Sequence, residues 1–96
     1  MIEVRQTAQF KRWLKSLRDI QAQARIARRI ERIEQGNFGD YKSVSGGVSE
    51  LRFTFGPGYR VYFIRKGDAL VILIGGGDKA SQNKDIQTAI EMAKEL

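Results

Sequence analysis

The sequence predicts an α+β domain in which helices pack on one face of a small antiparallel sheet. The prediction comes from the spacing of apolar residues, which is helical from residue 7 to residue 36, alternating from residue 51, and helical again after residue 80. The expected element order is therefore β-α-α-β-β-β-α. A chain of 96 residues suits one domain, residues 1–96. The other face of the sheet is then expected to be free to bind a ligand.

The first third of the chain predicts one strand and two helices. Residues 1–5 fit a short strand, and Thr7 then suits the N-cap of a helix. The apolar stripe of that helix repeats at i, i+3, i+4 and i+7 and comprises Phe10, Trp13, Leu14 and Leu17. A second helix is expected to begin after Asp19 and to end at Gly36. The two helices are close enough in sequence to form a helical hairpin.

The second helix is strongly amphipathic. Its expected apolar side contains Ile20, Ala24, Ala27, Ile30 and Ile33, with Ile26 at the edge. The opposite side carries four arginines, Arg25, Arg28, Arg29 and Arg32. A row of this kind is either a solvated face or a surface that contacts RNA or a ribosome.

The rest of the chain predicts a meander of three strands and a final helix. Residues 37–47 are polar and glycine-spaced, which is typical of a connection. Two alternating segments flank the turn at residues 56–58, and the nearly uninterrupted apolar run 69–76 suits a central strand. The last helix is expected to start near Ser81 or Asn83 and to bury Ile86, Ala89, Ile90 and Ala93.

The register of the first hairpin decides which residues share a face. A two-residue turn would place Arg60 among the apolar side chains, whereas a three-residue loop pairs Phe55 with Tyr59 and Phe53 with Val61. We adopt the second register because it keeps the apolar residues together. The polar side of the hairpin then comprises Arg52, Thr54, Arg60 and Tyr62.

This polar side could bind RNA, because a guanidinium binds a phosphate through two parallel hydrogen bonds and a tyrosine ring can stack on a base. The alternative is a solvated face without a ligand. The segment GGGDK, residues 75–79, does not match the GxxxxGK[ST] phosphate-binding pattern. Its glycines are expected to open space at the strand end, with Lys79 and Lys84 beside the start of the last helix, where an anion is favoured. Three other aromatic residues are expected to pack rather than to stack on bases: Trp13, Phe38 and Tyr41.

Composition restricts the functional classes. Lys and Arg number 17 against 11 Asp and Glu, a net charge of +6 that favours an anionic partner such as nucleic acid. Histidine and cysteine are absent, which excludes Ser-His and Cys-His nucleophile pairs, disulfides and the usual zinc sites. The sequence has no secretory h-region and no run of transmembrane length. We therefore expect a cytoplasmic protein without a metal or cofactor.

The segments ELRF, GYRVYF and GGDKASQNKDI, in this order, resemble the RelE/HigB superfamily of bacterial toxin–antitoxin toxins. The likeness covers residues 1–96 and is greatest to the phage-related "addiction module killer protein" branch. It implies a RelE-like fold and a ribosome-dependent endoribonuclease that cleaves mRNA and arrests translation. It also implies two partners: mRNA on the ribosome, and a cognate antitoxin, typically a small helix-turn-helix protein.

The resemblance assigns catalytic roles by position. Arg60 in GYRVY matches the strand arginine of the family, Arg52 in ELRF the basic residue one strand earlier, and Lys79 in GGDK the cation after the last strand. Lys84 lies where other members place a further catalytic side chain. The sequence lacks the histidine or C-terminal tyrosine that some members use. Tyr62 and the four helix arginines are the expected RNA-binding residues.

The chemistry suits these residue types. RNA cleaves itself when its 2′-oxygen attacks the adjacent phosphorus, so the enzyme needs to orient the strand and to stabilise charge. Arg52 and Arg60 would hold the phosphate, and Lys79 or Lys84 would act as acid or base; Glu50 is a weaker alternative for the base. Two other functions remain open: a toxin of the same fold that inhibits gyrase, and a non-enzymatic module that binds RNA or a protein partner.

Overall fold

The computed structural model describes residues 1–96 and confirms the α+β class, with five strands and three helices. The elements are β1 (Glu3–Gln6), α1 (Ala8–Ser16), α2 (Ile20–Glu34), β2 (Tyr41–Ser45), β3 (Val48–Arg52), β4 (Arg60–Lys66), β5 (Leu70–Gly77) and α3 (Gln82–Ala93). The predicted helices and the four predicted strands are all present. The fifth strand, β2, lies in the segment predicted to be a connection.

The sheet has the strand order β1-β5-β4-β3-β2. The strands from β2 to β5 pair antiparallel, which confirms the predicted meander of β3, β4 and β5, but β1 pairs with β5 in parallel, so the sheet is mixed. β5 lies between β1 and β4, and its residues are buried or half-buried, which confirms the central position predicted for its apolar run. β2 forms one edge, and four of its five residues are exposed, so no apolar alternation marked it in the sequence.

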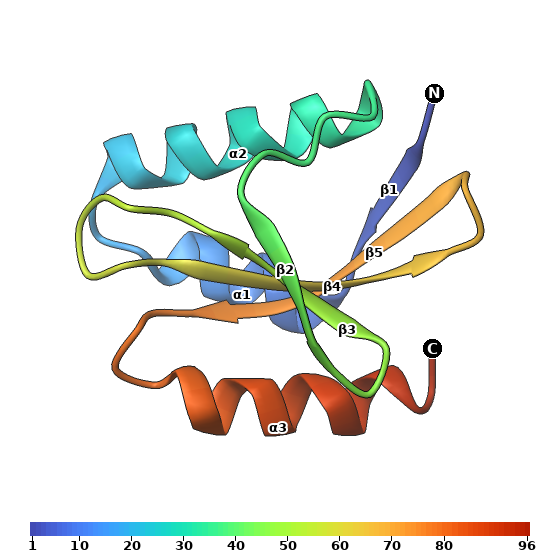
Figure 1. Cartoon of the computed structure of the whole chain (residues 1–96). Coiled ribbons are helices and arrows are strands. Elements are labelled where there is room, and N and C mark those ends of the chain that lie inside the picture. The colour runs from blue at the N-terminus through green and yellow to red at the C-terminus, as the bar shows by residue number, and fades with distance from the viewer.

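Helices cover both faces of the sheet (Figure 1). Side chains of α1 and α2 meet Val61 and Phe63 of β4 in the larger core, whereas α3 packs over Tyr62 and Ile64 on the opposite face. The expectation that all helices lie on one face and leave the other free is therefore wrong. The apolar residues that alternate along β4 point to both sides, and each side requires a cover. None of the three helices has the length and apolar character required to span a membrane.

The N-caps of α1 and α2 follow the sequence, whereas Ser81, at the start of α3, makes no capping hydrogen bond with its side chain. Thr7 accepts a hydrogen bond from the backbone N–H of Phe10, and Asp19 accepts from Gln21 and Ala22. Gly36 has φ +88°, the left-handed conformation of a residue that follows a helix C-cap.

The buried side of α2 differs from the prediction. It is formed by Ala22, Ile26, Ile30 and Ile33, while Ile20 is 78% exposed. Two apolar stripes overlap on this helix, and the one that contains Ile26 faces the sheet. Relative to the prediction, α2 is rotated about its axis, and Arg29 therefore lies at the border of the core and not on the solvent-facing side.

The hairpin of β3 and β4 has the predicted faces but a different register. Leu51 pairs with Val61 and Arg52 with Arg60, two residues away from the expected pairing. A shift of two residues keeps every side chain on its face, so the predicted grouping of apolar residues holds. Residues 53–59 form the connection, with a turn closed by the N–H of Gly58 on the carbonyl of Phe55.

Glycines at the end of β5 allow helices to approach closely. A Cβ atom at Gly76 would overlap the ring of Trp13 in α1, and one at Gly77 would overlap the carboxylate of Asp85 in α3. The expectation that these glycines open space for a ligand is wrong, because the protein's own side chains fill that space.

Candidate functional site

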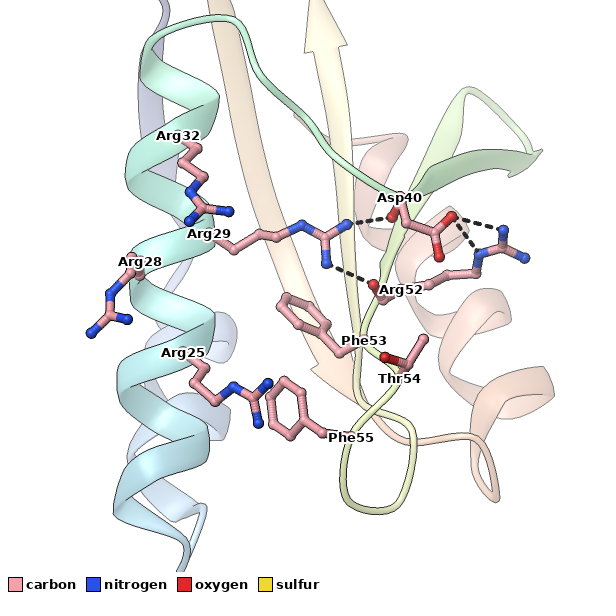
Figure 2. Close-up of a pocket in the computed structure, with 9 residues that line it drawn as sticks. All are labelled: Arg25, Arg28, Arg29, Arg32, Asp40, Arg52, Phe53, Thr54 and Phe55. Carbon is pink, nitrogen blue, oxygen red and sulfur yellow. Dashed lines mark hydrogen bonds and ion pairs between the residues drawn. The ribbon is translucent and has the colours of Figure 1, made fainter.

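Two open pockets meet on the surface at the end of β3. The first, about 480 Å³, lies between the four arginines of α2 and residues 52–55 (Figure 2). The second, also about 480 Å³, lies between the 56–58 loop and Asp40 and includes Arg52, Arg60 and Lys79. Because both pockets share Asp40 and residues 52–54, they form one continuous basic surface.

Arg29 connects α2 to the strand region. Its Nη1 donates to the carbonyl of Arg52 at 2.7 Å and its Nη2 to that of Asp40 at 2.5 Å, with longer contacts to Phe38 at 3.4 Å. The guanidinium also lies 4.6 Å from the ring centroid of Phe53. Burial lowers the pKa of Arg29, and the nearby Asp40 partly offsets this. Arg29 was predicted to bind RNA, but its guanidinium nitrogens already donate to backbone carbonyls of the protein itself.

The other three arginines of α2 are exposed. Arg25 stacks on Phe55, with 3.9 Å between its guanidinium carbon and the ring centroid (Figure 2). Arg28 and Arg32 make no hydrogen bond with their side chains. These three keep free donors on the rim of the first pocket.

Arg52 is paired in the free protein. Its Nη2 lies 2.8 Å and its Nε 3.3 Å from Oδ1 of Asp40. The hydrogen bond from Arg52 holds the pKa of Asp40 below its usual range. Because both side chains are partly exposed, at 37% and 49%, a competing anion can reach Arg52.

Arg60 is more buried than the sequence predicted, with 13% of its side chain exposed. Its Nη1 donates to the carbonyls of Gly58 at 2.9 Å and Tyr59 at 3.1 Å. Its Nε lies 3.9 Å from Oε1 of Glu50, too far for a hydrogen bond, and has no other partner. The guanidinium is therefore held by its surroundings and still lines the second pocket.

The structure adds Glu50 and Gln82 to the surroundings of Arg60. Glu50 is fully buried, and Nε2 of Gln82 donates to its two carboxylate oxygens at 3.1 Å and 3.0 Å. The position of Glu50 two residues before Arg52, on the same face of a strand, was a signal available in the sequence. No signal in the sequence pointed to Gln82, because its proximity to Glu50 depends on how α3 crosses the sheet.

The two lysines predicted to be catalytic, Lys79 and Lys84, lie in different parts of the surface. Lys79 is exposed, lines the second pocket, and is held near the 56–58 loop by its backbone N–H, which donates to the carbonyl of Pro57 at 3.3 Å. Lys84 is exposed on α3 and lines neither pocket. Of the four predicted catalytic residues, the structure thus brings Arg52, Arg60 and Lys79 together.

Comparison with known proteins identifies the family. The family described as "Phage derived protein Gp49-like (DUF891)" matches residues 12–96. The chain belongs to the Gp49-like family. An uncharacterized protein of Haemophilus influenzae is 48% identical over 95 residues, which is 99% of this chain and 96% of that protein.

In this Gp49-like chain, the aromatic residues serve packing. Phe38 belongs to the larger core and the half-buried Trp13 packs against it, as expected. Tyr41 packs on Phe38 at 5.4 Å between ring centroids while remaining 43% exposed. Tyr62 lies on the predicted face, but α3 covers it and leaves 1% of the residue exposed. Burial raises the pKa of its hydroxyl. The expectation that Tyr62 offers an open ring for base stacking is wrong.

Proposed function

We propose that this protein is the toxin of a toxin–antitoxin pair and a ribosome-dependent endoribonuclease of the RelE/HigB type. The observation that carries the proposal is the convergence of Arg52, Arg60 and Lys79 on one open pocket. The Gp49-like family suggests a toxin context, and its phage origin agrees with the phage-related branch of the sequence resemblance.

Strand cleavage in this pocket begins with attack of the 2′-oxygen of RNA on the adjacent phosphorus. The 2′ proton passes to water in the open pocket, the bond from phosphorus to the 5′-oxygen breaks, and the 5′-oxygen takes a proton from an acid. Arg52 and Arg60, directly paired across β3 and β4, would bind the phosphate oxygens as negative charge develops. A phosphate would displace Asp40 from Arg52 because both anions use the same donors.

Lys79 is the side chain best placed to protonate the leaving 5′-oxygen. It is exposed and lines the pocket, and its ammonium has three N–H donors, one of which can give its proton to the oxygen. Glu50 is a poor candidate for the base, because it is fully buried and lines neither pocket.

The first pocket would hold the flanking RNA strand or ribosomal RNA. Arg25, Arg28 and Arg32 provide exposed guanidinium groups along one side of α2, and these can follow a phosphate backbone. The same basic surface suits an acidic segment of the cognate antitoxin, which we expect to be a small helix-turn-helix protein.

The test is to incubate purified protein with ribosomes and mRNA and to map the new 5′ ends. A ribosome-dependent nuclease generates cleavage only within translated mRNA on ribosomes. Inhibition of DNA supercoiling without cleavage would instead identify a gyrase inhibitor. Binding without either effect would identify a non-enzymatic RNA-binding module. Both of these outcomes contradict the proposal.

A further inference from the structure

Glu50 is the one charged residue that is fully buried. A carboxylate removed from water is strongly destabilising unless hydrogen bonds or a cation compensate it. Its two compensating partners are Gln82, which donates to both oxygens, and the guanidinium of Arg60, at 3.9 Å from Nε to Oε1. Gln82 therefore fixes the carboxylate while Arg60 supplies the opposite charge.

This arrangement restricts how Arg60 can face the pocket. The carbonyls of Gly58 and Tyr59 accept hydrogen bonds from its Nη1, and the negative charge of Glu50 attracts the edge of the guanidinium that carries Nε. The remaining Nη2 makes no hydrogen bond within the protein and is not sealed from solvent. The guanidinium thus presents one free edge to the second pocket, which it lines with Arg52.

We propose that Glu50 and Gln82 are positioning residues that orient the guanidinium of Arg60 toward a phosphate in the second pocket. This inference rests on the proposed function, in which Arg60 binds the reacting phosphate. It also gives α3 a role, because Gln82 in its first turn makes the contact. Asp40 is the competing anion, since it lines the same pocket and would attract Arg60 if Glu50 no longer held it.

The variant Gln82→Met tests the proposal, with Asn83→Met as the matched control. Methionine keeps the length and helix propensity of glutamine but cannot donate to Glu50. Asn83 is the next residue of α3, is exposed, and lines neither pocket. Glu50→Gln is the second variant, which keeps the shape of the side chain and removes the attracting charge.

Cleavage of mRNA on ribosomes is measured together with thermal unfolding and the Nε–Hε NMR signal of Arg60 during titration with inorganic phosphate. We expect Gln82→Met to lower kcat by about tenfold to a hundredfold with KM nearly unchanged, as misplacement by about 1 Å can do. The Arg60 signal should exchange with water faster than in the wild type and respond more weakly to phosphate. Asn83→Met should match the wild type in all three measurements.

A Gln82→Met protein with the kcat and the Arg60 signal of the control would overturn the proposal, as would a lower melting temperature without either change. If Glu50→Gln does not fold, Gln82→Met alone decides. If the wild type cleaves no mRNA, the proposed function fails, and the Arg60 signal still decides whether Glu50 and Gln82 orient this side chain.

Discussion

Among the arginines of α2, neighbouring residues have opposite roles. Arg29 donates to three backbone carbonyls and ties the helix to the segment around β2 and β3. Arg28, one position earlier, is exposed and has no such partner. The helical pattern alone placed both on one solvated face, because the two overlapping apolar stripes left the rotation of the helix undecided.

Replacement of Arg29 should therefore destabilise the protein, whereas replacement of Arg28 should not. We expect Arg29→Ala to lose about 1–3 kcal/mol in the free energy of unfolding, because three backbone carbonyls, two of them in part-buried hydrogen bonds, lose their charged donor. Arg28→Ala should stay within about 0.5 kcal/mol of the wild type. Urea unfolding of both variants measures the difference, and equal midpoints would contradict the structural role of Arg29.

The pairing of Asp40 with Arg52 predicts a pH dependence. The hydrogen bond from Arg52 lowers the pKa of Asp40 in the folded protein, so its stabilising effect is complete above the pKa of an unfolded aspartate, about 3.9. The effect is lost as the pH falls through the lower folded value. Asp40→Asn should thus be less stable than the wild type at pH 6 and approach it at pH 2. Unfolding midpoints that differ equally at both pH values would contradict this linkage.

Much of the site could be predicted from residue types and strand positions. Arg52 and Arg60 share a face because their strand positions have the same parity, which survives a register shift of two. The place of Lys79 could be predicted because it follows the last residue of β5, Gly77, by two positions. The burial of Arg60 and of Tyr62 could not be predicted, because it depends on α3 crossing the second face of the sheet.

At the scale of elements, the central strand and the helices were the most predictable. The apolar run of β5 and the caps at Thr7 and Asp19 follow from local chemistry. β2 was missed because an edge strand with one half-buried residue has no apolar alternation. The parallel position of β1 depends on tertiary packing and has no local signature.

The contact of α1 with β5 requires a glycine at position 76. We expect Gly76→Ala to cost about 1–3 kcal/mol of stability, because its methyl group would overlap the ring of Trp13 and force a shift. Gly75→Ala is the matched control, since its Cβ would meet the flexible end of Gln9 at 3.4 Å. Thermal unfolding compares the two, and a Gly76→Ala protein as stable as the control would show that α1 packs less closely on the sheet.

At the scale of the whole molecule, the net charge of +6 combines with one continuous basic surface. If this surface binds RNA, affinity for ribosomes should fall steeply with salt, by a slope of about 0.7 per phosphate contact on single strands. The triple variant Arg25→Ala, Arg28→Ala, Arg32→Ala should reduce that slope and still fold, because all three side chains are exposed. A flat salt dependence of wild-type binding would indicate a partner recognised without phosphate contacts.

The central claim is that Arg52, Arg60 and Lys79 form a site that cleaves RNA. The most direct measurement is the rate of mRNA cleavage on purified ribosomes by Arg52→Ala and Lys79→Ala, which remove exposed or partly exposed side chains and should leave the fold intact. Lys11→Ala, on the exposed side of α1, is the control. We expect each site variant to remain folded and to cleave slower by a factor on the order of 10². Lys79→Ala should melt like the wild type, and Arg52→Ala at a somewhat lower temperature because it loses the pairing with Asp40. Cleavage at the wild-type rate by both folded variants would contradict the claim.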